Sequence, residues 1–218
     1  RKASHLNDMA MAEITHFFKE GVTETDLAEQ LKKIYRDLGA DGLSFEPLFA
    51  FGSNAASGHH WPDDTRLKPG DCILVDIGCT WEGYCSDMTR TFFYKNVTQH
   101  QQEVYHTVLK ANEEAEKAVT PGIPLSSLDQ IARGIITDKG YGSAFTHRLG
   151  HFIGLEDHEF GDVSSASADR AVPGNIFSIE PGVYLENDMG VRVEDLVLVT
   201  DHGHEILNHF SKELTVID

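Results

Sequence analysis

The chain has 218 residues, of which 40% are hydrophobic and 24% are charged, and its formal net charge is −17. These values fit a globular domain with a sizeable core, and no apolar run approaches the roughly 18 residues that a membrane helix needs. Because an acidic surface repels phosphate backbones, we expect neither nucleic acid nor a membrane as a partner.

The cysteines argue against a disulfide framework. Cys72, Cys79 and Cys85 form neither an even set nor a C-x-x-C motif. This pattern favours a reducing, cytoplasmic setting and a packing role for all three thiols.

Two helices are predicted at the start of the chain. Apolar residues recur at roughly helical spacing over residues 3–20, and Gly21 ends the run. Thr25 is expected to cap a second helix over residues 26–38.

A hairpin follows a loop that carries His59 and His60. Residues 72–78 and 84–94 are runs rich in β-branched and apolar side chains, separated by a short turn. Two such runs are typical of a β-hairpin.

The second half repeats this order. Helices are predicted over residues 99–118 and 125–139, followed by a histidine-rich segment over residues 147–158. Strands over residues 175–185 and 191–200 form the second predicted hairpin. The shared order suggests a duplicated, pseudo-twofold domain.

An acid interrupts each of the four core-like runs: Asp76 and Asp87 in the first predicted hairpin, Glu180 and Glu194 in the second. A single acid of this kind is usually exposed on an edge strand, because carboxylates are rarely buried without a partner. Four acids in one sheet need compensation, since two unit charges about 4 Å apart repel by ~4 kcal/mol at an effective dielectric of 20. Only two arginines lie in these runs, so multivalent metal ions are the better explanation.

Three histidines accompany these acids in the segment HRLGHFIGLEDH, at positions 147, 151 and 158. Gly150 and Gly154 flank His151 and allow the backbone to approach closely there. Carboxylates with one imidazole suit Mn²⁺ or Co²⁺, whereas a structural zinc site would favour thiolates.

Five segments together resemble the pita-bread metallopeptidases, a family that includes aminopeptidase P, prolidase, methionine aminopeptidase and creatinase. The segments are VDIG with Asp76, SDMTRTF with Asp87, HRLGHFIGLEDHE with His151, SIEPGVY with Glu180, and VRVEDLVLVT with Glu194. They span nearly the whole chain in the family's order. The resemblance implies an α+β fold with pseudo-twofold symmetry and a curved antiparallel sheet that has helices on its outer face.

The same resemblance implies a centre of two divalent metal ions, Mn²⁺ or Co²⁺ first, with Zn²⁺ or Fe²⁺ as alternatives. Asp76 would chelate one ion, Asp87 and Glu194 would bridge both, and His151 and Glu180 would complete the second. A hydroxide held by the two ions would attack the scissile bond, and Glu180 would also move the proton of this nucleophile.

Other residues are similar to those of the branch that cleaves Xaa-Pro bonds. His59 aligns with a histidine that binds substrate near the metals, and His158 with one that stabilises the tetrahedral intermediate. His147 matches a histidine that lines the proline pocket, and Arg192 an arginine beside the bridging glutamate. Phe152 departs from the glycine that is common after the ligand histidine, and we expect it to narrow the pocket or reshape its wall.

The leading interpretation is therefore an Xaa-Pro dipeptidase acting on small peptides with proline at the second position, with a homodimer as the candidate assembly. An aminopeptidase P acting on longer peptides is the alternative within the class. A non-catalytic binding module or a metal-independent creatinase-like hydrolase would be expected to lack metal ligands, and this chain keeps all five. We expect residues 1–218 to be one catalytic domain, without the upstream domain that these enzymes normally carry.

Overall fold

The computed structural model describes residues 1–218, and its first helix is shorter than predicted. Helix α1 (Lys2–Thr15) ends before Gly21 because the hydrogen bonds tighten to the i→i+3 pattern. The amide of Phe18 bonds to the Thr15 carbonyl at 3.2 Å. Phe18 is nevertheless buried, so the apolar spacing continues beyond the helix.

Helix α2 (Glu24–Leu38) begins earlier than predicted, because Thr23 is its cap rather than Thr25. The Thr23 hydroxyl accepts a hydrogen bond from the Asp26 amide at 3.0 Å, and the Asp26 carboxylate accepts one from the Thr23 amide at 3.2 Å. This reciprocal capping box needs a suitable side chain three residues after the cap, and Thr25 has Ala28 at that place.

The first predicted hairpin is confirmed and lies at the centre of a four-stranded sheet. Strand β3 (Cys72–Ile77) pairs antiparallel with β6 (Met88–Tyr94). The outer strands are β2 (Leu48–Phe51), beside β3, and β14 (Val216–Ile217), which runs parallel to β6. A small sheet at the hairpin's tip contains β1 (Gly42–Leu43), β4 (Cys79–Trp81) and β5 (Tyr84–Cys85).

The second half begins with the two predicted helices, α3 (Gln99–Ala118) and α4 (Leu125–Asp138). Thr98 and Gln101 form a second capping box at the start of α3. A five-stranded sheet follows, in the order β13-β12-β9-β7-β8. Its strands are β7 (Gly150–Phe152), β8 (Glu159–Val163), β9 (Ile176–Ile179), β12 (Asp195–Thr200) and β13 (Gly203–Ile206). Two short 3₁₀ helices, η1 (Gly52–Ala56) and η2 (Gly142–Ala144), lie in the connections.

The strands of the second predicted hairpin are both interrupted, which the sequence did not indicate. The ladder between β9 and β12 stops, and a separate ladder continues between β10 (Gly182–Leu185) and β11 (Met189–Arg192). The breaks fall at Glu180-Pro181 on one side and at Val193-Glu194 on the other. Pro181 contributes to the break because it has no amide hydrogen for a ladder.

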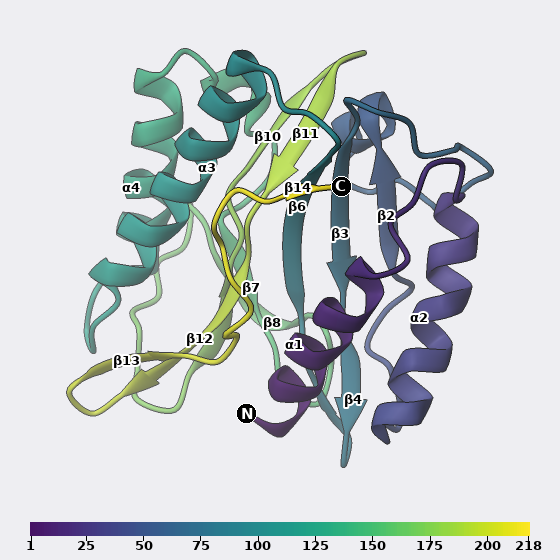
Figure 1. Ribbon diagram of the computed structural model, residues 1–218. Helices are drawn as coiled ribbons and strands as arrows, with labels where there is room; N and C mark the ends of the chain where they lie inside the picture. Colours follow the sequence, from purple (N-terminus) through teal and green to yellow (C-terminus); the bar gives the residue numbers. More distant parts are fainter.

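Two hydrophobic cores correspond to the two halves. Figure 1 shows α1 and α2 on one side of the molecule and α3 and α4 on the other. Along β3 the side chains alternate between these cores: Ile73 and Val75 belong to the core of α1 and α2, whereas Cys72 and Leu74 belong to that of α3 and α4. The sheets therefore form the middle of the molecule and the helices its outside, as the predicted α+β pita-bread fold requires.

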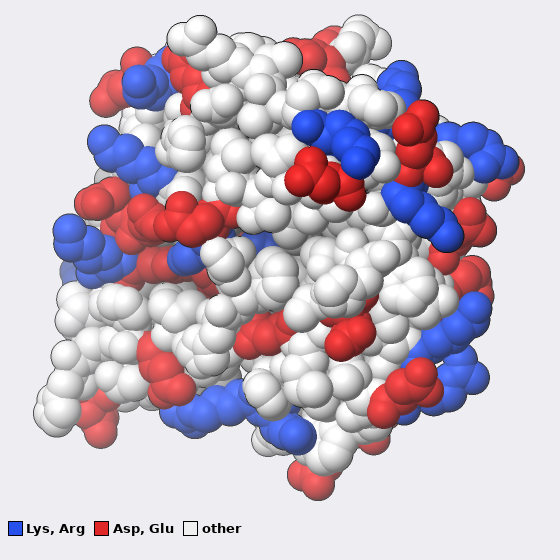
Figure 2. Space-filling model, viewed as in Figure 1, with Lys and Arg blue, Asp and Glu red and all other residues white.

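The surface is charged and mixed. On the face seen in Figure 2, acidic and basic side chains are interspersed over the helices. None of the helices is long and apolar enough to cross a membrane. All three cysteines are unpaired, and Cys72 and Cys79 are buried, which agrees with a packing role for these two.

Candidate metal centre

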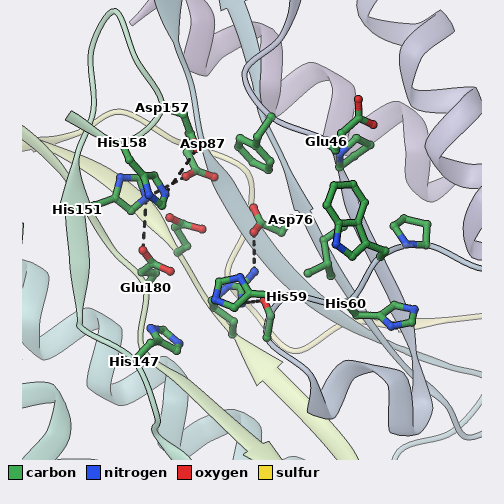
Figure 3. A pocket seen from close by; sticks show the side chains of 18 of the residues that line it. Glu46, His59, His60, Asp76, Asp87, His147, His151, Asp157, His158 and Glu180 are labelled. Carbon is green, nitrogen blue, oxygen red and sulfur yellow. Dashed lines mark hydrogen bonds and ion pairs between the residues drawn. The ribbon is translucent and has the colours of Figure 1, made fainter.

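A cavity of about 430 Å³ is lined by every catalytic, substrate-binding and metal-binding residue that the sequence predicted. Figure 3 shows the side chains converging on it from strands of both halves and from the loop before β3. The predicted residues that line it are His59, Asp76, Asp87, His147, His151, His158, Glu180, Arg192 and Glu194. They come from segments more than 100 residues apart in the sequence.

Strand alternation aims the two aspartates at this cavity. Asp76 lies two residues after Leu74 on β3, and therefore on the face that points away from α1 and α2. Asp87 immediately precedes β6 and lies two residues before Thr89, so the two side chains share a face. The Thr89 hydroxyl donates a hydrogen bond to Glu194 Oε2 at 2.6 Å. Both aspartates thus face the acids of the second half.

The two glutamates lie where the ladders of the second hairpin break. The Glu194 amide bonds across to the Thr89 carbonyl of the first half at 3.1 Å, and the Glu180 amide bonds to the Leu149 carbonyl at 2.8 Å. Each backbone is therefore held by a strand or segment outside its own ladder. The breaks free these side chains from the regular pleat and turn them into the cavity.

His151 lies on β7, which packs unusually close to β9. A Cβ atom at Gly150 would lie 1.9 Å from the Ser178 carbonyl oxygen, so only glycine fits there, as the flanking glycines suggested. The His151 amide donates to Ser178 Oγ at 3.0 Å. Its Nε2 then lies 3.3 Å from Asp87 Oδ2 and 3.5 Å from Glu180 Oε1.

The site carries carboxylate oxygens that nothing in the protein satisfies. Potential ligand atoms of Asp87, His151 and Glu194 all lie within 4.8 Å of one another. Asp76 Oδ1, Asp87 Oδ1 and Glu194 Oε1 are buried and accept no hydrogen bond. Burial, followed by repulsion from neighbouring carboxylates, raises the pKa of Asp87 and of Glu194 well above the ordinary range. Unsatisfied buried oxygens of this kind fit divalent cations.

Protein cations compensate little of this charge. Arg192 Nη2 donates to Asp76 Oδ2 at 2.6 Å. Arg90 is the other arginine of these strands, but it pairs with Asp195 Oδ1 at 2.6 Å and binds backbone carbonyls, including that of Glu194. The imbalance that the sequence suggested therefore persists in the folded site.

A tyrosine that the sequence analysis did not single out connects three of the predicted residues. The Tyr184 hydroxyl accepts a hydrogen bond from Arg192 Nη1 at 2.8 Å and lies 2.9 Å from His147 Nε2. His147 Nδ1 is 2.7 Å from the Arg148 carbonyl oxygen, and burial lowers the pKa of His147. A chain of contacts thus runs from His147 through Tyr184 and Arg192 to Asp76.

The structure distinguishes the two adjacent histidines of the loop. His60 Nε2 lies 2.7 Å from Glu24 Oε2, and Glu24 is fully buried with both oxygens engaged. His60 therefore anchors the loop to α2. His59 is exposed to the cavity and is free to meet a ligand.

His158 and Asp157 form another wall of the cavity. The His158 ring lies against that of His151, with centroids 3.9 Å apart and ring planes tilted by 39°, and burial followed by the charge of His151 lowers the pKa of His158 to about 4. Asp157 was not singled out from the sequence, although it lies between two histidines that were. Burial and the nearby acids raise its pKa to about 7.

The expectation for Phe152 was wrong. It does not line the cavity, because strand alternation turns it away from the side on which His151 lies. Its ring packs instead against Phe177, with centroids 5.7 Å apart. The thiols of Cys79 and Cys85 do not line the cavity either.

Comparisons with known proteins agree with this arrangement. An uncharacterized peptidase of Staphylococcus aureus (strain MW2) is 44% identical over 212 residues, which are 97% of this chain and 60% of that protein. The prolidase of Pyrococcus furiosus superposes with a TM-score of 0.94 at 35% identity, over 96% of this chain and 62% of its own. The X-Pro aminopeptidase of Thermotoga maritima gives 0.96 at 35% identity, over 99% of this chain and 61% of its own.

The chain thus spans about 60% of the length of the curated relative described above. The family model of metallopeptidase family M24 matches residues 1–201, which include all the acids and histidines of the cavity. With this match, and with folds in common with prolidases, the chain belongs to metallopeptidase family M24.

Proposed function

We propose that this protein hydrolyses Xaa-Pro bonds in small peptides and uses two divalent metal ions to do so. The observation that carries the proposal is the group of buried carboxylate oxygens, on Asp76, Asp87 and Glu194, that accept no hydrogen bond. The proposed ligands are Asp76, Asp87, His151, Glu180 and Glu194. Four carboxylates and one imidazole favour Mn²⁺, with Co²⁺, Zn²⁺ and Fe²⁺ as alternatives.

When bound, the ions would polarise the scissile carbonyl and lower the pKa of a water molecule at the site. In this proposal Glu180 takes a proton from that water. It is only half-buried, its Oε1 accepts a hydrogen bond from Ser178 Oγ at 3.0 Å, and its carboxylate borders the cavity. Such a carboxylate can accept the proton and pass it to the leaving nitrogen.

Two histidines complete the proposed reaction. His158 has a lowered pKa of about 4, so it is neutral near pH 7 and would donate a hydrogen bond from its ring to the oxygen that gains charge. His59, at the other side of the cavity, would bind the peptide.

The His147 end of the cavity supports proline in the residue after the scissile bond. Both ring nitrogens of His147 are already engaged, one with the Arg148 carbonyl and the other with the Tyr184 hydroxyl. The Tyr184 hydroxyl also accepts a hydrogen bond from Arg192. His147 therefore offers no free nitrogen to accept the N–H of a secondary amide. The tertiary amide of an Xaa-Pro bond has no N–H to bury.

The test is a panel of Ala-Pro, Ala-Pro-Ala and longer peptides, assayed after removal of metal and again with Mn²⁺, Co²⁺ or Zn²⁺. We expect hydrolysis only with metal, and fastest for the dipeptide. Faster cleavage of the longer peptides would indicate the aminopeptidase alternative. Purified protein that binds no divalent metal and cleaves none of the peptides would refute the proposal.

A further inference from the structure

Asp157 is a carboxylate of the cavity that the proposed mechanism does not use. It is half-buried, and its Oδ1 is shielded from solvent and accepts no hydrogen bond. Its Oδ2 lies 3.6 Å from His158 Nε2. It does not belong to the group of possible metal ligands formed by Asp87, His151 and Glu194.

The charges around Asp157 leave it without a partner. Arg192 is paired with Asp76. Arg148 also lines the cavity, but its Nη2 points to His158 Nδ1 at 3.4 Å and forms no ion pair with Asp157. Asp157 therefore forms no ion pair with an arginine or lysine of the protein, and a cation from outside would satisfy it.

The position of Asp157 indicates which part of a peptide would bring that cation. In Figure 3, Asp157 and His147 lie at opposite ends of a row of labelled side chains, with Asp87, His151 and Glu180 between them. If proline lies at the His147 end, the residue before the scissile bond extends toward Asp157. Its α-amino nitrogen is two bonds from the reacting carbonyl carbon and stays near the ligands, whereas a long side chain reaches farther.

We propose that Asp157 selects substrates whose first residue has a cationic side chain, lysine or arginine, in front of proline. This inference rests on the proposed Xaa-Pro hydrolysis and adds the identity of the first residue. An ammonium or guanidinium group would donate to the accessible side of the Asp157 carboxylate, whose side chain is 24% exposed, and the contact is charge-assisted.

The experiment compares Lys-Pro with norleucyl-proline, which has the same aliphatic chain without the charge, using the metal-loaded protein. We expect kcat/KM to favour Lys-Pro by about five- to thirtyfold, the range of a charged hydrogen bond reduced by partial exposure. The Asp157→Asn variant should bring this ratio close to one while still hydrolysing norleucyl-proline. The Glu46→Gln variant is the matched control, because Glu46 is an acid at the same cavity whose side chain is 58% exposed; its ratio should equal that of the wild type.

Equal kcat/KM for the two peptides in the wild-type protein would overturn the role of Asp157, whether or not the variant is stable. An unchanged ratio in the Asp157→Asn variant would overturn it as well. These outcomes leave the proposed Xaa-Pro hydrolysis standing. Hydrolysis of neither peptide by the metal-loaded protein would instead overturn the proposed function together with this inference.

Discussion

Removal of metal should destabilise this protein more as the pH rises. Asp87 and Glu194 have raised pKa values in the metal-free fold, caused first by burial and then by neighbouring carboxylates. An acid whose pKa is higher in the folded protein than in the unfolded protein stabilises the fold below its unfolded pKa, which is near 4. This stabilisation is lost as the pH rises through the pKa of the folded protein. The metal-free protein should therefore lose stability from about pH 4 upward, while metal ions should bind more tightly as the acids ionise.

The size of the effect follows from the geometry and from mass action. Two unit charges 4.8 Å apart, the upper limit of the ligand-atom separations among Asp87, His151 and Glu194, repel by about 3 kcal/mol at an effective dielectric of 20. Metal present at 100 times its dissociation constant raises the free energy of unfolding by about 2.7 kcal/mol. In a domain of this size, 1 kcal/mol corresponds to roughly 2–4 °C, so metal at pH 7.5 should raise the Tm by about 5–11 °C.

The assay is thermal unfolding from pH 4.5 to pH 8, with chelator or with Mn²⁺, for the wild type and the Asp87→Asn variant. In chelator at pH 7.5 the variant should be more stable than the wild type by about 1–3 kcal/mol, because part of the repulsion is gone. Addition of Mn²⁺ should raise the Tm of the variant less than that of the wild type. A Glu46→Gln variant controls for the general loss of one negative charge. A metal-free wild type that becomes more stable toward pH 8, or that is as stable as the loaded form, would refute the reasoning.

Four further changes probe other parts of the site and the fold. Glu180→Gln should lower kcat by about 10²–10⁴-fold and change KM much less; near-native turnover would exclude the proton-transfer role. Ala-Pro should be cleaved about tenfold to a hundredfold more efficiently than Ala-Ala, since the latter buries an unpaired N–H, and equal kcat/KM values would count against the Xaa-Pro assignment. Tyr184→Phe should raise KM for Ala-Pro by about three- to tenfold through loss of one hydrogen bond, and the metal-induced rise in Tm should be retained. An unchanged KM would show that Tyr184 does not help to bind the proline residue. Thr23→Ala should lower the free energy of unfolding by about 1 kcal/mol in urea titrations, whereas Thr25→Ala should change it less; the reverse order would contradict the capping box.

The sequence was informative wherever a local rule was sufficient. The bounds of α3 were predictable because Thr98 and Gln101 satisfy the capping box within four residues. The first hairpin followed from two apolar runs and a turn, and the anomaly of acids inside such runs pointed to a cation site without any knowledge of the fold. Alternation along β3 also implied that Asp76 shares a face with Leu74.

The sequence misled where two local solutions competed. Thr23 and Thr25 are both acceptable caps, and only the position of Asp26 decides between them. Phe152 follows a residue of the cavity directly, but the pleat of β7 turns its ring into the core. Neighbours in sequence thus belonged to different environments.

Other features depended on contacts between distant segments. The breaks beside Glu180 and Glu194 require backbone partners from the Leu149 segment and from Thr89, which no window of a single strand contains. Tyr184 joined the site through His147 and Arg192, and Asp157 became notable only because its neighbours left one oxygen unsatisfied. The sequence determined which chemical groups were present and which face of a strand carried them. The tertiary structure decided which of those groups share a cavity, because charge repulsion and hydrogen-bond satisfaction depend on distance in space rather than along the chain.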